Sequence, residues 1–192
     1  MKEPIQVLKD EHRIIEKALG ALDGLCDRLE RGAAVPPNAM EEIGDFIANF
    51  ADRFHHAKEE AHLFPVLEQN GVPKEGGPVG VMLDEHESGR RMAAAMRGDS
   101  EAYGRGDPKA GASFAESGRL FSGLLRSHIQ KEDNILFMIA GSVLDEGALG
   151  MVSRGFEAAQ AQFDRGFRER YQELASRLER DWAGGGGRMN DD

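Results

Sequence analysis

Hydrophobic residues recur along this chain at steps of three and four, the spacing of one face of an α-helix. In the first segment this stripe contains Ile5, Leu8, His12, Ile15, Leu19, Leu22, Cys26 and Leu29. Glycines and prolines interrupt the pattern around residues 31–38, 71–78 and 104–108. The pattern therefore predicts four helices joined by short turns, which favours antiparallel neighbours.

Histidine and glutamate interrupt the apolar stripes of these helices. The second helix carries Phe46, Phe50 and Phe54 ahead of two adjacent histidines, and the third stripe reads Val79, Met82, His86, Ala93 and Met96. The fourth stripe reads Phe114, Gly118, Phe121, Leu125, His128, Glu132, Ile135 and Ile139. Burying a polar or charged group without a partner costs free energy. The polar members of the stripes are therefore candidates for a functional site.

The remainder of the chain predicts a fifth helix. Apolar residues follow helical spacing at Phe156, Phe163, Phe167, Tyr171, Leu174 and Leu178. We expect residues 1–142 to form the helical bundle, residues 143–183 to form an amphipathic helix packed on the bundle or on a partner, and residues 184–192 to be disordered. No segment alternates with period two for long, so the fold class is all-α.

Composition narrows the range of partners and surroundings. The net charge of −10 and the pI near 5.1 disfavour nucleic-acid and anionic-membrane partners. The single cysteine, Cys26, excludes an internal disulfide and a four-thiolate metal site, and we expect it to pack as a small hydrophobe. Apolar runs are far shorter than the ~20 residues of a membrane span, and the first residues do not resemble a signal sequence. A soluble, cytoplasmic protein is expected.

The polar positions belong to a weak internal repeat. Asp-Glu-His occurs at 10–12 and again at 84–86, and the segment 55–60 corresponds to 128–133. His12 and His55 lie 43 residues apart, and His86 and His128 lie 42 apart. About 18 residues, or ~27 Å of helix, separate each histidine from the intervening turn. The spacing predicts that all four histidines lie at one level of the bundle.

Four histidines and two glutamates are the predicted metal ligands: His12, His55, Glu59, His86, His128 and Glu132. In the second and fourth helices, His-x-x-x-Glu places imidazole and carboxylate one turn apart on one face. We expect His12 and His55 to bind one ion, His86 and His128 to bind a second, and the two glutamates to lie between the ions. These ligand types suit iron, manganese and zinc alike.

Neighbouring residues leave alternatives open. His56 and Glu60 have the same one-turn spacing as His55 and Glu59, although the repeat favours the latter pair because Lys58-Glu59 corresponds to Lys131-Glu132. His62 follows one turn later, and we expect a packing or supporting role for it. A ferritin-like carboxylate site is disfavoured, because such sites use Glu-x-x-His and more carboxylates.

These motifs resemble the hemerythrin-like, or HHE cation-binding, family. The resemblance spans roughly residues 5–140 and rests on Glu11-His12, His55-x-x-Lys58-Glu59-Glu60, Glu85-His86-Glu87 and His128-x-x-Lys131-Glu132-Asp133. It implies an antiparallel up-and-down four-helix bundle holding two iron ions, with Glu59 and Glu132 as bridges. Oxygen-carrying members have a further histidine one turn after the third-helix histidine, where this chain has Arg90. The ligand set looks more like that of di-iron proteins linked to nitric oxide stress, iron–sulfur repair or oxygen and iron sensing.

The resemblance therefore implies a non-haem di-iron protein that binds O2, NO or peroxide as a sensor, store or detoxifier. Two alternatives stay open. One is a redox enzyme that reduces NO or H2O2, or serves iron–sulfur repair, at the same site. The other is a regulatory bundle whose stability depends on its metal. A protein partner or a homo-oligomer also stays open.

Overall fold

The computed structural model describes residues 3–184, and every regular element in that range is a helix, which confirms the all-α prediction. The elements are α1 (Pro4–Glu30), α2 (Pro37–Phe46), η1 (Ile47–His56), η2 (Glu59–Leu63), α3 (Phe64–Gln69), α4 (Pro78–Gly104), α5 (Ala110–Lys131), η3 (Glu132–Leu136), α6 (Phe137–Val143), α7 (Glu146–Gln160) and α8 (Phe167–Trp182). The η elements are π-helical, with hydrogen bonds that span one residue more than in an α-helix.

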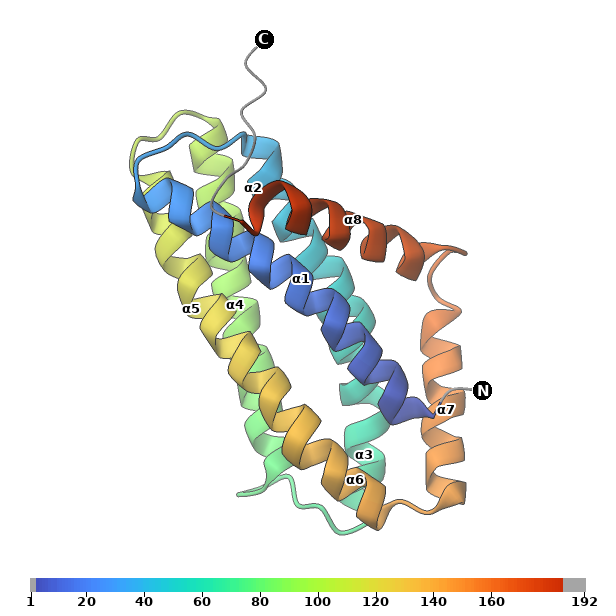
Figure 1. The fold of residues 1–192 in the computed structure, drawn as a ribbon. Coiled ribbons are helices and arrows are strands. Elements are labelled where there is room, and N and C mark those ends of the chain that lie inside the picture. The colour runs from blue at the N-terminus through green and yellow to red at the C-terminus, as the bar shows by residue number, and fades with distance from the viewer. Residues whose placement is uncertain (1–2, 185–192) are drawn as a thin grey trace.

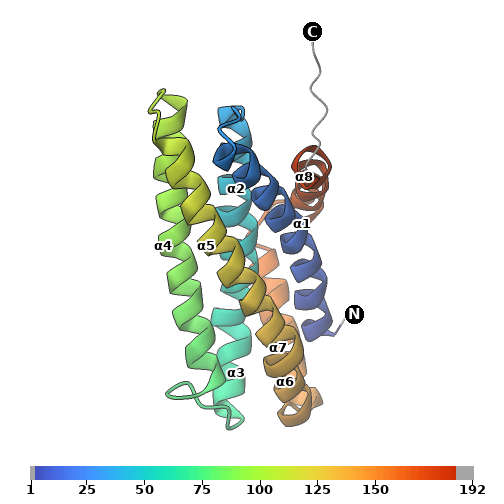
Figure 2. The same ribbon diagram turned by 60° about the vertical axis from the view of Figure 1, so that its left-hand side comes forward.

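Four long helical segments lie side by side: α1, α2 through α3, α4, and α5 through α6 (Figures 1 and 2). The three turns between them fall where glycine and proline predicted breaks. A residue with positive φ occurs in each turn, and it is Gly32, Gly71 or Gly106. Glycine suits these positions because it has no Cβ to clash in the left-handed region. None of the helices described is long and apolar enough to cross a bilayer.

The core consists of two apolar clusters separated by a polar level. One cluster lies toward the α1–α2 turn and includes Leu19, Phe50 and Phe121, and the other lies toward α3 and α6 and includes Leu8 and Leu136. In each long segment, the predicted ligands fall at the change from one cluster to the other. The polar residues are therefore held between two packed apolar layers, which restrict their side chains.

The π-helical segment η3 changes which residues of the fourth segment face inward. The α-helical stripe predicted that Ile135 is buried, and this is wrong: Ile135 is 54% exposed, whereas Leu136 and Phe137 are buried. The additional residue in the π turn shifts the inward face by one position after Glu132. An expectation based on a uniform α-helix cannot include that shift.

The segment after residue 143 forms two helices, not the single helix predicted. A turn that contains Gly166, with φ 85°, separates α7 from α8. The predicted aromatic face packs on the bundle of the same chain: the Tyr171 ring lies 5.9 Å from that of Phe50, and the Phe167 ring lies 5.2 Å from that of Phe54. The predicted disordered tail falls, apart from Gly184, outside the described residues.

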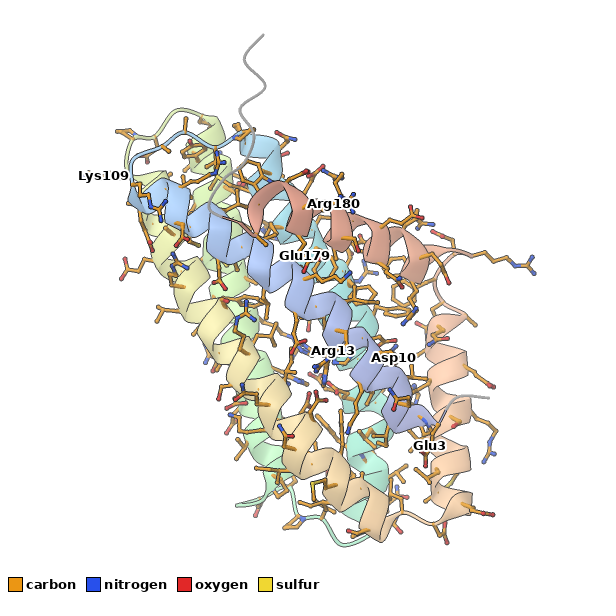
Figure 3. All side chains as sticks on the ribbon, in the orientation of Figure 1. Glu3, Asp10, Arg13, Lys109, Glu179 and Arg180 are labelled. Atoms are coloured by element: carbon orange, nitrogen blue, oxygen red, sulfur yellow. The ribbon has the colours of Figure 1, made fainter. Side chains whose placement is uncertain are left out.

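Helix α8 crosses over α1, and Gly24 of α1 permits the close approach. Glu179 of α8 lies over α1 (Figure 3), where its carboxylate is 3.7 Å from Nζ of Lys17. At the same contact, a Cβ on Gly24 would lie 1.8 Å from the carbonyl oxygen of Trp182, whereas a Cβ on Gly20 would only touch Ala183 at 3.4 Å.

We expect Gly24→Ala to destabilise the α1–α8 contact, because the clashing atom is backbone. The free energy of unfolding should fall by ~1–3 kcal/mol, the range for overpacking, measured by urea denaturation. Trp182, the only tryptophan, should report the displacement of α8 by fluorescence. Gly20→Ala is the matched control and should be neutral or stabilising, by up to ~1 kcal/mol from helix propensity. Equal behaviour of the two variants would contradict this account of the contact.

Cys26 is buried in the bundle, as predicted. It is 0% exposed, and burial raises the pKa of its thiol to about 12. Because the thiolate is the reactive form, we expect no alkylation by iodoacetamide in the folded protein at pH 8, and complete alkylation in denaturant. Rapid labelling of the folded protein would show that this part of the core opens.

Candidate metal centre

All six predicted ligands converge at the polar level of the bundle, and His56 joins them. Exposure is 2% or less for the six predicted residues and 7% for His56. These residues come from four different segments: His12 from α1; His55, His56 and Glu59 from η1 and η2; His86 from α4; His128 and Glu132 from the end of α5 and the start of η3. The structure thus brings together residues that lie up to 120 positions apart in the sequence.

The potential ligand atoms form two groups, each within 4.8 Å. One group is His12, His55, Glu59 and Glu132, and the other is His56, Glu59, His86 and His128. Glu59 belongs to both: one oxygen is 3.6 Å from Nε2 of His55, and the other is 3.6 Å from Nε2 of His86. This is the placement expected of a carboxylate that bridges two ions.

Glu132 also lies between the two histidine sets. Its Oε2 is 3.1 Å from Nε2 of His12 and 3.3 Å from Nε2 of His128. The arrangement agrees with the predicted pairing of His12 with His55 and of His86 with His128. That these side chains bind metal stays a prediction.

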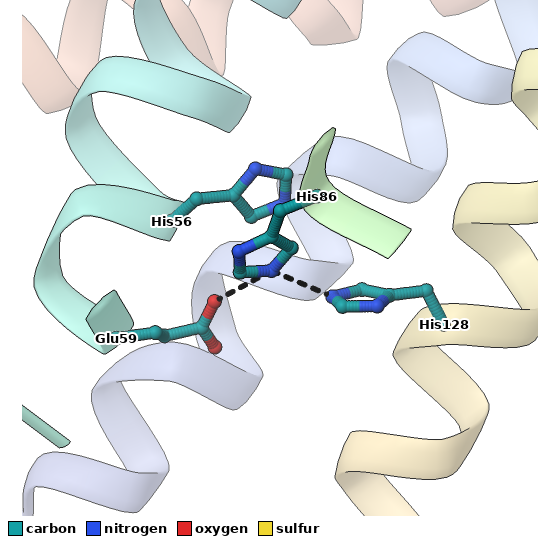
Figure 4. Close-up of side chains that lie close together, drawn as sticks. All are labelled: His56, Glu59, His86 and His128. Carbon is teal, nitrogen blue, oxygen red and sulfur yellow. Dashed lines mark hydrogen bonds and ion pairs between the residues drawn. The ribbon is translucent and has the colours of Figure 1, made fainter. Parts of the chain in front are cut away.

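His56, which the sequence left open only as an alternative to His55, lies in the same cluster as His55. Its ring stacks on that of His86 with centroids 3.8 Å apart, beside Glu59 and His128 (Figure 4). In an α-helix, adjacent side chains point about 100° apart, so only one of two adjacent histidines was expected to face the site. The π-helical η1 lets both His55 and His56 face inward. The signal in the sequence was the His-His pair itself, together with its two possible registers.

Of the alternative pair, His56 and Glu60, only one residue lies in the cluster. His56 enters the cluster, but Glu60 lies outside it, where its Oε1 is 2.7 Å from Nδ1 of His86 and 2.6 Å from a guanidinium nitrogen of Arg90. His62 is also outside, packed against Gly155 and the ring of Phe156 on α7. Its expected packing role agrees with this position.

The buried ligand atoms fit a metal because several of them make no hydrogen bond to the described part of the protein. The buried nitrogen and oxygen atoms that make no hydrogen bond within the described residues include Nε2 of His12 and His55, both ring nitrogens of His56, and both oxygens of Glu59 and Glu132. Leaving such groups buried and unpaired costs roughly 1–3 kcal/mol each, and more for charges. So many at one level are explained if cations bind between them.

Outside the cluster, four of the histidines are oriented by carboxylates. The Nδ1 atoms of His12, His55, His86 and His128 lie 2.8, 2.9, 2.7 and 3.0 Å from carboxylate oxygens of Asp133, Glu11, Glu60 and Glu85, respectively. A histidine that donates from Nδ1 to a carboxylate keeps the Nε2 lone pair for a metal, as in most histidine metal sites.

These carboxylates explain why the repeat extends beyond the ligands. Glu11 and Glu85 each precede a histidine of their own helix but orient a histidine of a neighbouring one, and Glu60 and Asp133 likewise follow a ligand glutamate. Each hydrogen bond therefore joins two helices. The repeated motif therefore includes carboxylates that orient histidines of other helices.

Lysines pair with two of these carboxylates, with unequal exposure. Lys58 pairs with Glu11 and is fully buried, and its Nζ lies 3.9 Å from the centre of the Phe54 ring. Lys131 pairs with Glu85 and is 33% exposed.

The fifth histidine of the cluster, His56, lies near a different carboxylate: its Nδ1 is 3.6 Å from Asp52, which also binds Arg90. Burial opposes the charge on Asp52, but the neighbouring His56 and the hydrogen bond from Arg90 outweigh burial and lower the pKa of Asp52 to about 2.

The two central glutamates have opposite electrostatic surroundings. Burial, and then the charge of Glu132, raises the pKa of Glu59 well above its usual value. Burial also acts on Glu132, but His128 and His12 outweigh it and lower the pKa of Glu132 well below its usual value. The protein alone therefore keeps one of the two carboxylates charged and disfavours the second. Cations at this level would supply the positive charge that an ionised Glu59 lacks in the protein alone.

Comparison with known proteins bears on the same region. Uncharacterized proteins of Mycobacterium bovis and of two strains of Mycobacterium tuberculosis are each 24% identical over 150 residues, which is 78% of this chain. The chain spans 58% of the length of these relatives. No solved structure gives a significant match. Residues 3–140 match the hemerythrin HHE cation-binding domain, and this chain belongs to that family.

Proposed function

We propose that this protein is a non-haem di-iron protein that binds a small ligand, O2, NO or peroxide, as a sensor, store or detoxifier. In this proposal the four long segments form the antiparallel up-and-down bundle expected from the resemblance. The metal ligands are the six predicted residues together with His56. The ions would supply Lewis acidity and redox chemistry, and the protein supplies their position and surroundings.

One observation carries the proposal: buried nitrogen and oxygen atoms without hydrogen bonds converge from α1, from η1 and η2, and from η3, while the Nδ1 atoms of four histidines are held by carboxylates. A structural network would satisfy both nitrogens. In His12 and His55, Nδ1 is held by a carboxylate and Nε2 makes no hydrogen bond, which is the arrangement of a metal-binding histidine. In His86 and His128, Nδ1 is likewise held by a carboxylate, and the two Nε2 atoms lie 3.1 Å from each other.

The donor count supports the binding of an external ligand. Each group offers four protein residues, with Glu59 shared. An octahedral ion takes six ligands, so each ion keeps positions that protein side chains do not fill. Iron is preferred over zinc or manganese because of the family, since imidazole and carboxylate accept all three.

Elemental analysis of protein purified without oxygen tests the proposal. We expect about two irons per chain, falling sharply in His128→Ala and in Glu132→Ala, because each change removes a ligand from the cluster. Iron below one per chain that neither substitution alters would sink the di-iron proposal. Absorbance changes on adding NO to the reduced protein, or azide to the oxidised protein, then test ligand binding. Steady consumption of NO or H2O2 with a reductant would identify an enzyme instead.

A further inference from the structure

A cavity of about 330 Å3 lies beside the metal centre. It is bounded by α2 and η1 on one side and by α4 and α5 on the other, and it extends to His56, His86 and His128. Figure 4 shows how these three rings lie together at the side of Glu59. The other group, with His12 and His55, does not line the cavity.

Small side chains create this space. Gly44 and Ala48 on one wall face Gly89 and Ala93 on the other. A Cβ on Gly44 would meet nothing within 4 Å, and one on Gly89 would meet its nearest neighbour, the Phe121 ring, only at 3.7 Å. Larger side chains would fit at these positions and fill the gap, so the sequence leaves the cavity open at several points along two helices.

The cavity is larger than a diatomic ligand requires. At ~30 Å3 per water molecule, its volume corresponds to about eleven waters. Sites for organic ligands begin near 300 Å3 and have mainly apolar walls. The walls here are mainly apolar, with Ile47, Ala51, Phe121 and Leu125 among them. The size and the lining both fit an organic molecule with an apolar body.

The charges around the cavity indicate the polar end of that molecule. Asp52 and Arg90 bind each other, and Glu85 binds His128 and Lys131. Arg97 is exposed and makes no hydrogen bond or ion pair with another residue in the range 3–184. It is therefore the one charged side chain of the lining that is left for a ligand, and it is positive.

We propose that this cavity binds an amphipathic carboxylate, with its carboxylate at Arg97 and its apolar chain directed toward His56. Arg97 and His86 lie eleven residues apart on α4, about 16 Å along the helix, which suits a medium-chain acid such as decanoate. The site adds an organic ligand to the small ligand proposed above. Binding depends on Arg97 and the apolar walls, not on the metal.

Calorimetric titration with decanoate tests the site in metal-free and metal-loaded protein. We expect saturable binding of one molecule per chain in both forms, and weaker binding of 1-decanol, which lacks the charge. Arg97→Gln should raise the Kd for decanoate about tenfold and leave that for decanol unchanged. The matched control is Arg91→Gln, an exposed arginine of α4 outside the cavity, which should leave both values unchanged.

Filling the cavity provides an independent test. Ala93→Leu should abolish binding of both decanoate and decanol, and Ala48→Leu, on the opposite wall, serves if the first variant does not fold by circular dichroism. Equal binding of decanoate and decanol, equal effects of Arg97→Gln and Arg91→Gln, or unchanged binding in a folded cavity-filling variant would each overturn the proposal. Metal content is measured separately from decanoate binding. Failure of the di-iron proposal would therefore leave the result for the cavity unchanged, and failure of the cavity proposal would leave the result for the metal unchanged.

Discussion

Glu59→Gln is expected to lower the metal content from about two ions per chain to near zero, because Glu59 is shared by both ligand groups. An amide offers one oxygen and no charge, so it cannot bridge two cations as the carboxylate does. Elemental analysis after saturation with iron and removal of excess metal measures the loss. Glu60→Gln is the matched control: Glu60 orients His86 from outside the cluster, so affinity should fall ~10–100-fold, but two ions should still bind at saturation.

The same substitution should stabilise the metal-free protein. Burial and the charge of Glu132 raise the pKa of Glu59, so the folded state holds a proton that the unfolded chain releases above its ordinary pKa of 4.5. The stability associated with this proton is present below pH 4.5 and is lost as the pH rises through the raised pKa. The amide of the variant does not titrate, so the variant should exceed the wild type at neutral pH by ~1–3 kcal/mol, the range for an unsatisfied buried group.

Urea denaturation in the presence of a chelator, from pH 4.5 to pH 8, measures this difference. The gap between variant and wild type should widen as the pH rises. A variant that loses metal and is also less stable without metal would indicate that Glu59 has a structural role, and would contradict the role assigned to it here.

His56→Ala is expected to reduce the metal content from about two ions per chain to about one. His56 belongs to one ligand group, and its loss leaves the group of His12, His55, Glu59 and Glu132 complete. The six-residue set expected from the sequence predicts no change for this substitution. Elemental analysis therefore distinguishes a site with five histidines from one with four.

His62→Ala is the control for this experiment. It removes a partly buried histidine from the same stretch of helix, but one that packs on α7 and lies outside both ligand groups. Two ions per chain should remain. Full metal content in His56→Ala would show that His56 only packs against His86, and would return the site to the six predicted residues.

The hydrophobic pattern predicted the helices and their turns because burial of an amphipathic face depends on local spacing, which the sequence displays directly. The level at which His12, His55, His86 and His128 meet followed from helix rise and turn position. Within the bundle, the prediction was wrong at Ile135 and incomplete at His56, and at both places a π-helical segment intervenes. Such a segment changes the inward face by one residue and has no clear signature in hydrophobic spacing.

Sequence by itself determined the all-α class, the residue types of the site and its family resemblance, because helical periodicity and paired motifs are local properties of the chain. Only the tertiary structure decided how the carboxylates are used: Glu11 orients His55 and Glu85 orients His128 across helices. It also decided that α7 and α8 pack on the bundle and that small residues leave a cavity beside His56. These features depend on distances between segments remote in sequence, which packing fixes and periodicity does not.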